Sequence, residues 1–269
     1  MAHVSTGTMT PLSAKAWRTR VLLLAGLGLA ALAGVLLLKP IPQPEAYHAF
    51  KDTRAFLGIP NFLNVVSNLP FLIVGLMGLR WLRAKPPGLA AELRAPYAVV
   101  FAGLALTAFG SAYYHWAPDS RTLFWDRLPI AVSFMGLYGA VLAERVALSA
   151  AMKLLVPLVL FGAGSVLVWH LTNDLRLYAV AQFFPVLTIP LILWLFPAAF
   201  SRGGDFLAAI GCYVAAKIFE EIDGAVYGLG QIVSGHTLKH LAAAAGAYWI
   251  YRMLTLRQPR PAPSRDLRA

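Results

Sequence analysis

Five residues whose chemistry suits a metal-dependent reaction lie in two short stretches of this 269-residue chain. Ser111, His115 and Asp126 lie in the stretch 111–129, SAYYHWAPDSRTLFWDRLP, and His236 and His240 lie in the stretch 234–242, SGHTLKHLA. Both stretches border strongly apolar runs. An ionisable side chain at membrane depth costs several kcal/mol unless it is paired, hydrated or bound to a metal, so by default it marks a functional site.

The spacing of the three histidines predicts a zinc site. His236 and His240 are four residues apart, which on a helix places both imidazoles on one face, about 6 Å apart along the axis. The same spacing relates Ser111 to His115, so a hydroxyl group and a third imidazole share the face of another helix. Three neutral imidazoles with an open fourth position are typical of catalytic zinc, where bound water titrates near pH 7. We therefore expect Zn²⁺ to be held by His115, His236 and His240.

Asp126 and Ser111 are the predicted catalytic residues beside this metal. Two roles stay open for Asp126. It can take a proton from the metal-activated water or orient that water, or it can accept a hydrogen bond from a ligand imidazole. Ser111 is suited to donate a hydrogen bond to the oxyanion that develops when water attacks a carbonyl carbon.

Two other interpretations of the histidines also stay open. A single histidine on an apolar helix is usually a core residue with satisfied hydrogen bonds, and a haem iron is another possible ligand of a His-x3-His pair. Haem ligation usually takes histidines from facing helices, for which only His115 and His170 remain. The convergence of three histidines, a serine and an aspartate at one depth favours a hydrolytic metal site.

The composition predicts a polytopic membrane protein. Hydrophobic residues make up 59% of the chain, charged residues only 13%, and the mean hydropathy is +0.65, whereas about 25% of residues are charged in soluble proteins. The net charge of +11 does not indicate nucleic-acid binding, because the basic residues lie in short segments between apolar runs. The single cysteine, Cys212, excludes an intramolecular disulfide and a multi-cysteine metal site.

Apolar runs of about 20 residues predict an all-α fold with a seven-helix transmembrane core and one additional N-terminal transmembrane helix. The eight predicted spans are 19–38, 61–82, 96–116, 126–145, 152–171, 177–199, 206–223 and 235–254. The first has the charged flank of a signal peptide, but its apolar run is long and no clear cleavage site follows, so we expect it to be retained.

This pattern divides the chain into three parts. Residues 1–45 form a cytoplasmic N-terminus, the additional helix and the start of a Pro-rich linker, residues 46–255 form the catalytic core, and residues 256–269 form a disordered basic tail.

The distribution of Lys and Arg predicts that both termini are cytoplasmic. The termini and the loops on their side of eight spans hold fifteen of these residues, against six on the opposite side. His115, Asp126 and His236 would then share the outer end of the bundle. A short chain with few long loops suits a bacterial inner membrane, so we expect the lipid bilayer as its surroundings and no nucleic-acid partner. Protein partners cannot be read from the sequence.

Other polar residues at membrane depth are predicted to be structural. Lys217 and Glu221 are spaced to form an intrahelical pair that lowers the cost of burial. The start of the second span carries side chains suited to hydrogen bonds between helices: Asn61, Asn64, Ser67 and Asn68. A transporter built around the charges of the seventh span would require repeat symmetry between two halves, which the sequence lacks.

The combination of Ser111-x3-His115, Asp126 and His236-x3-His240 resembles the alkaline ceramidase family. That family belongs to a superfamily of seven-helix membrane hydrolases that includes the adiponectin and progestin receptors. The stretch 61–69, NFLNVVSNL, is also similar to the family's first helix, and the resemblance spans roughly residues 50–255. One departure concerns the family's acidic calcium-binding segment, which corresponds here to KDTRAFLGIP, with Asp52 as its only acidic residue.

The resemblance implies a zinc amidase that cleaves the N-acyl bond of ceramide and releases a fatty acid and a sphingoid base. His115, His236 and His240 match the family's zinc ligands, Asp126 matches the residue that handles the catalytic water, and Ser111 matches the hydroxyl on the oxyanion side. We therefore expect a metal-dependent amidohydrolase with a ceramide-like membrane lipid as substrate.

Two alternatives remain beside this expectation. One is a hydrolase of another acyl lipid. The other is a receptor-like protein that uses the same metal to stabilise the bundle or to sense a lipid. A dedicated receptor should carry a sizeable signalling domain, whereas only a short segment follows Arg252, and this difference favours an enzyme.

Overall fold

The computed structural model describes residues 12–260, and within them the chain is helical and without strands. The helices are α1 (Ala14–Leu37), α2 (Phe62–Val66), α3 (Leu69–Arg83), α4 (Arg94–Trp116), α5 (Ser120–Arg145), α6 (Leu148–Thr172), α7 (Arg176–Leu195), α8 (Gly204–Glu221), α9 (Asp223–Gly228) and α10 (Gly235–Leu256). Two short 3₁₀ helices, η1 (Glu45–His48) and η2 (Ala91–Leu93), precede α2 and α4.

Six helical segments among the described residues are long and apolar enough to cross a membrane. They are Ala14–Leu37, Phe62–Arg83, Ala91–Trp116, Ser120–Arg145, Leu148–Thr172 and Arg176–Leu195. The predicted all-helical fold is thus confirmed for the described residues, and the six candidate spans agree with a membrane protein. The last two predicted spans correspond to α8 and α10, which form helices but fall outside these six.

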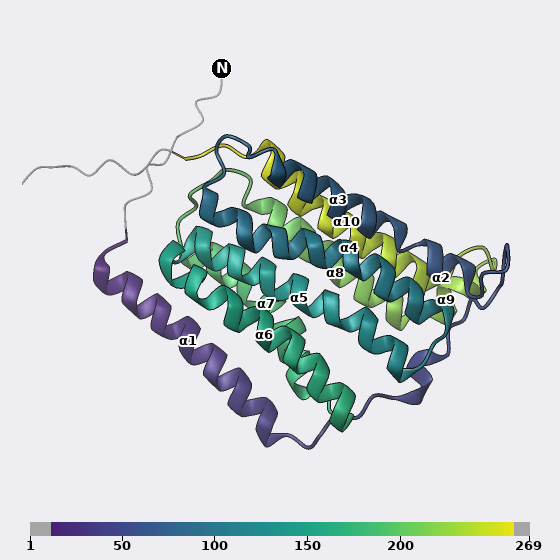
Figure 1. The fold of residues 1–269 in the computed structure, drawn as a ribbon. Helices are drawn as coiled ribbons and strands as arrows, with labels where there is room; N and C mark the ends of the chain where they lie inside the picture. Colours follow the sequence, from purple (N-terminus) through teal and green to yellow (C-terminus); the bar gives the residue numbers. More distant parts are fainter. Residues whose placement is uncertain (1–11, 261–269) are drawn as a thin grey trace, which may run out of the picture.

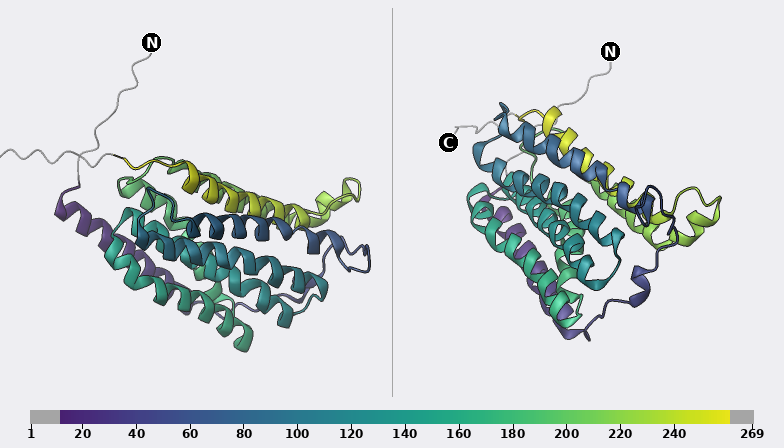
Figure 2. Two further views of the ribbon diagram at one scale, coloured as in Figure 1. Left: turned by 45° about the horizontal axis from the view of Figure 1, so that its top comes forward. Right: turned by 45° about the vertical axis from the view of Figure 1, so that its right-hand side comes forward.

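The long helices run roughly alongside one another in one bundle (Figures 1 and 2). Contacts of α3 with α4, α4 with α5, α5 with α7, α7 with α8, α8 with α10 and α10 with α3 close a ring of six helices. Outside this ring, α6 packs on α5 and α7, and α1 packs on α7 (Figure 1). The first and last described residues lie at the same end of the bundle (Figure 1).

Helix α5 begins at Ser120, six residues before the predicted start, because Asp119 caps it. The Asp119 side chain accepts hydrogen bonds from the backbone N–H groups of Arg121 and Thr122, and the Thr122 hydroxyl accepts one from the Asp119 backbone. This reciprocal capping box satisfies donors that a helix start leaves free. Asp126 therefore lies within the helix and not at its first residue.

The second predicted span is two helices, α2 and α3, separated by Ser67 and Asn68. Pro70, at the start of α3, has no backbone N–H to donate to a continuous helix, so a proline is tolerated best at such a start. The interruption leaves Ser67 and Asn68 buried inside the bundle.

A close approach of α4 and α5 depends on Gly110. A Cβ atom built at this position would lie 2.0 Å from the carbonyl oxygen of Trp125. No side chain fits at that distance, so glycine lets the two backbones touch one turn before His115 and directly before Asp126. Small residues at such contacts are typical of helices packed in membranes.

The linker between α1 and α2 crosses the end of the bundle where α4 ends and α10 begins, which we call the histidine end. Asp174 accepts a hydrogen bond from the Ile41 backbone, and the Arg176 side chain donates to the carbonyl oxygen of Leu38. Hydrogen bonds from the Arg176 side chain hold the pKa of Asp174 at about 2, below its usual range. This ion pair fastens the linker to the start of α7.

The opposite end of the bundle holds the largest hydrophobic cluster, which includes the fully buried Tyr97 and Phe101. Arg257 forms a buried ion pair there with Glu144, and the Ser201 backbone donates to the carbonyl oxygen of Gln258. The first residues of the predicted disordered tail are therefore packed against the bundle. The remainder of that predicted tail, residues 261–269, lies outside the described residues.

Candidate metal centre

The three predicted metal ligands meet in one buried cluster at the histidine end. His115 comes from the last turn of α4, and His236 and His240 come from the first two turns of α10. One ring nitrogen from each lies within 4.8 Å of the others, and the Nε2 atoms of His115 and His240 are 3.2 Å apart. Two nitrogen ligands of one tetrahedral zinc ion lie about 3.3 Å apart. The cluster can therefore hold a metal ion.

Burial and unpartnered nitrogens support this fit. The three histidines are 5% exposed or less. The Nδ1 atom of His115 and the Nε2 atom of His236 have no hydrogen-bond partner among the described residues, although buried polar atoms are nearly always paired. A metal ion bound among the rings would remove part of this deficit, because neutral imidazoles donate lone pairs to it.

Ser67 orients the His240 ring. The Ser67 hydroxyl donates to the carbonyl oxygen of Asn64 at 3.2 Å, and its oxygen lies 2.7 Å from the Nδ1 atom of His240. With its proton directed to Asn64, the hydroxyl accepts a hydrogen bond from Nδ1–H, which leaves the Nε2 lone pair free to bind a metal. Such partners fix the tautomer and direction of ligand histidines.

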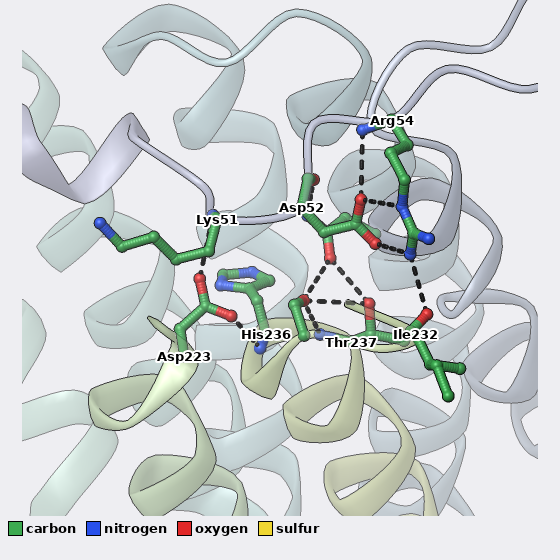
Figure 3. Close-up of polar contacts among 9 residues, drawn as sticks. Lys51, Asp52, Arg54, Asp223, Ile232, His236 and Thr237 are labelled. Atoms are coloured by element: carbon green, nitrogen blue, oxygen red, sulfur yellow. Dashed lines mark hydrogen bonds and ion pairs between the residues drawn. The ribbon is translucent and has the colours of Figure 1, made fainter. Parts of the chain in front are cut away.

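His236 is held through the backbone at the start of α10. Asp223 accepts hydrogen bonds from the backbone N–H groups of His236, at 2.8 Å, and of Lys51, at 3.2 Å. Figure 3 shows this carboxylate between the linker and the helix start. Ser234 caps α10 by accepting a hydrogen bond from the Thr237 backbone. These contacts fix the rotation of α10 and hence the direction of both of its histidines.

The linker also covers the cluster from outside. The Phe50 ring is buried, and its centroid lies 4.7 Å from the ring centroids of both His115 and His236. Next to it, the Arg54 side chain binds Asp52 and the carbonyl oxygen of Ile232 (Figure 3). The hydrogen bonds from Arg54 lower the pKa of the Asp52 carboxyl group. The histidines are thereby shielded from water at this end.

Ser111 and Asp126 lie beside the cluster in the wall of a cavity. The cavity has a volume of about 440 Å³ and lies inside the ring of six helices, with His240 also in its wall. The Asp126 side chain faces the Ser111 hydroxyl across the contact of α4 and α5. The structure thus brings together all five residues that the sequence singled out, and among the described residues no hydrogen bond joins Asp126 to one of the three histidines.

Most of the cavity wall is apolar. It follows α10 from His240 to Ile250, which corresponds to about 15 Å of helix. The facing wall is formed by side chains of α4, α5, α7 and α8, among them Leu104, Phe134, Val186 and Ile210. An apolar space that extends along α10 from His240 suits the length and polarity of a hydrocarbon chain.

A second group of charged residues lies at the polar end of the same cavity. Glu220 pairs with Lys239 and with Lys217, and it accepts a hydrogen bond from the Tyr47 hydroxyl. The predicted partner of Lys217 was Glu221, which is exposed instead. Lys217 pairs with Glu220 and not with Glu221 because the Glu220 carboxylate faces α10, where it also pairs with Lys239.

Sequence analysis did not single out Lys239, Glu220, Arg127, Ser67 and Phe50 as parts of this site. Lys239 and Arg127 directly neighbour the predicted site residues His240 and Asp126, and a charged residue at membrane depth was the signal that could have identified them. Ser67 was noted only as a packing residue. Nothing in the spacing of Phe50 indicates a contact with two histidines.

Comparisons with known proteins do not assign the chain to a family. No protein-family model matches it, and a search of curated proteins found no match either. The interpretation of the site therefore depends on its geometry and on the residues that form it.

Proposed function

We propose that the protein is a zinc-dependent hydrolase that cleaves amide bonds of lipids within the membrane, with ceramide as the reference substrate and a fatty acid and a sphingoid base as products. One observation carries the proposal: three buried histidines, two of them with an unpartnered ring nitrogen, lie at the polar end of a long apolar cavity, beside a serine and an aspartate. A polar, water-soluble substrate would lose hydration in such an apolar cavity, whereas an acyl chain is stabilised there.

In this proposal His115, His236 and His240 hold the zinc ion. The metal supplies a Lewis acid that polarises a carbonyl group and lowers the pKa of water. Asp126 takes up the proton of the water that attacks the carbonyl carbon and returns it to the departing nitrogen. Ser111 donates a hydrogen bond to the carbonyl oxygen as negative charge develops on it. The C–N bond breaks, and the products are a carboxylic acid and an amine.

The proposal includes membership of the alkaline ceramidase family, on the strength of the residues that carry the resemblance. It also includes the finer topology. In that topology α8 and α10 complete a seven-helix transmembrane core, α1 is an additional span, both termini are cytoplasmic, and the site lies toward the outer face of a bacterial inner membrane. The common position of the first and last described residues agrees with an even number of spans (Figure 1).

A receptor-like protein with a structural metal is the second candidate. The contact of Phe50 with two of the histidines favours it, because a covered metal is typical of a structural site. The cavity beside His240 favours the hydrolase, because a substrate must reach the metal, whereas a structural metal site is closed on all sides.

The decisive experiment measures metal content and fatty-acid release from ceramide in the same detergent-purified samples. We expect about one zinc per chain and release of fatty acid in the wild type, and neither in His236→Ala. His170→Ala, which alters an exposed histidine at the end of α6, is the matched control and should behave as wild type. Zinc without release would favour the receptor-like protein or another acyl lipid, and folded wild type without zinc would refute the metal site.

A further inference from the structure

Arg127 is a buried cation in the cavity wall that forms no ion pair among residues 12–260. Its side chain is only 5% exposed. Its Nη2 atom donates to the side-chain oxygen of Gln43, whereas its Nη1 atom is buried without a hydrogen-bond partner in the described part of the chain. A buried charge with an unpaired N–H donor destabilises the folded protein unless a bound ligand accepts that hydrogen bond.

Aromatic rings lie around this guanidinium group. Its central carbon lies 4.2 Å from the ring centroid of Trp169, 4.9 Å from that of Tyr178 and 5.4 Å from that of Tyr47. Rings in this position attract the cation through their faces. They accept no strong hydrogen bonds from N–H groups, which point outward in the guanidinium plane and match the two oxygens of a carboxylate or phosphate.

The charges at the polar end of the cavity are not balanced. Lys217 and Lys239 share the single carboxylate of Glu220, and the other charged side chains of the cavity wall are Arg127 and Asp126. Three cations against two carboxylates leave one positive charge, and a divalent metal at the histidines would increase the excess. In an apolar cavity an uncompensated charge is strongly unfavourable, so a bound anion would be stabilised there.

We infer that the lipid bound in this cavity carries an anionic group, a carboxylate or a phosphate, on its non-acyl part, and that Arg127 binds this group. The inference rests on the proposed function, which sets the acyl chain along α10 and the amide beside Asp126. It makes acylated amino acids or phosphorylated acyl amides the preferred substrates, with neutral ceramide bound more weakly. Arg127 and Asp126 both lie in the wall of this cavity, so the anion and the amide would occupy the same space.

Binding measurements test this inference without requiring turnover. The probes are N-oleoylglycine and its neutral methyl ester, and, for a phosphate source, ceramide 1-phosphate and ceramide. We expect the detergent-solubilised wild type to bind at least one anionic probe about tenfold more tightly than its neutral counterpart. In Arg127→Gln this preference should fall to about one while binding of the neutral probe is kept. Arg127→Lys should keep part of it.

Arg121→Gln is the matched control, since Arg121 is an exposed arginine of the same helix, and it should keep the full preference. Equal binding of each anionic and neutral pair by the wild type would overturn the inference even if Arg127→Gln failed to fold. A preference that survives in folded Arg127→Gln would also overturn it and make Arg127 a structural residue held by Gln43 and the rings. Anion-selective binding without fatty-acid release would refute the hydrolase and leave the anion site standing.

Discussion

The Nδ1 atom of His240 lies 2.7 Å from the Ser67 hydroxyl, although 173 residues separate them in the sequence. This contact joins the interruption between α2 and α3 to the first turns of α10. It fixes which nitrogen of His240 faces His115, and so links the packing of the bundle to the direction of a candidate metal ligand.

Replacing Ser67 by alanine should weaken metal binding without unfolding the protein. The His240 ring would lose the acceptor for its Nδ1–H group, and such losses typically lower metal affinity by about 10-fold to 100-fold. Titration with a competing chelator measures the affinity. Ser165→Ala, which removes a buried hydroxyl bonded within α6, is the control. Equal affinity of Ser67→Ala and wild type would show that Ser67 does not orient the ligand.

Replacing Asp126 by asparagine should separate metal binding from chemistry. The amide keeps the size of the side chain but cannot accept a proton, so we expect full zinc content and a fall in turnover of about 100-fold to 10,000-fold. Fatty-acid release and elemental analysis on one sample measure both. Glu221→Gln, at an exposed carboxylate on α8, should leave both unchanged. Wild-type turnover in Asp126→Asn would remove the residue from the mechanism.

A larger side chain at Ala247 should shorten the acyl chain that the cavity accepts. Ala247 lies in the cavity wall almost two turns of α10 beyond His240. In Ala247→Phe we expect release from long-chain amides to fall about tenfold or more, because the ring occupies space needed by the chain, while short-chain amides keep their rates. Ala245→Phe alters an exposed position of the same helix and should change neither. Parallel losses for both chain lengths would argue against this path for the chain.

Replacing Gly110 by alanine should destabilise the bundle by about 1 to 3 kcal/mol, because the new Cβ atom would meet the Trp125 carbonyl oxygen at 2.0 Å. Thermal unfolding in detergent measures the change. At Gly164, in α6, nothing lies within 4 Å of an added Cβ atom, so Gly164→Ala should be neutral or slightly stabilising. An unchanged unfolding temperature in Gly110→Ala would mean that the two helices do not touch there.

The ion pair of Asp174 and Arg176, which attaches the linker to α7, should weaken at low pH. The pKa of Asp174 is about 2 in the folded protein and about 3.9 in an unfolded chain. Its stabilising contribution is therefore complete above about pH 4 and is lost as the pH falls toward 2. The difference in unfolding temperature between wild type and Asp174→Asn should be constant from pH 7 to 5 and shrink below pH 4. A difference that does not depend on pH would contradict this.

Hydrophobic runs and short motifs predicted much of this protein. Apolar runs of span length are sufficient to predict helices, since a membrane leaves the backbone few alternatives, and all eight predicted segments are helical. The i, i+4 spacing determines that His236 and His240 share a face, whatever the helix packs against.

Only the tertiary structure decided what these elements bring together. The capping of α5 by Asp119, the break at Ser67, and the shift from Glu221 to Glu220 as the partner of Lys217 follow from side chains meeting across helices. The unpaired Arg127 and the cover formed by Phe50 have the same origin. Sequence spacing records distances along one helix, whereas the rotation and depth of each helix in the ring are set by packing against all the others. The histidine cluster could therefore be named from the sequence, but the cavity and its charge could not.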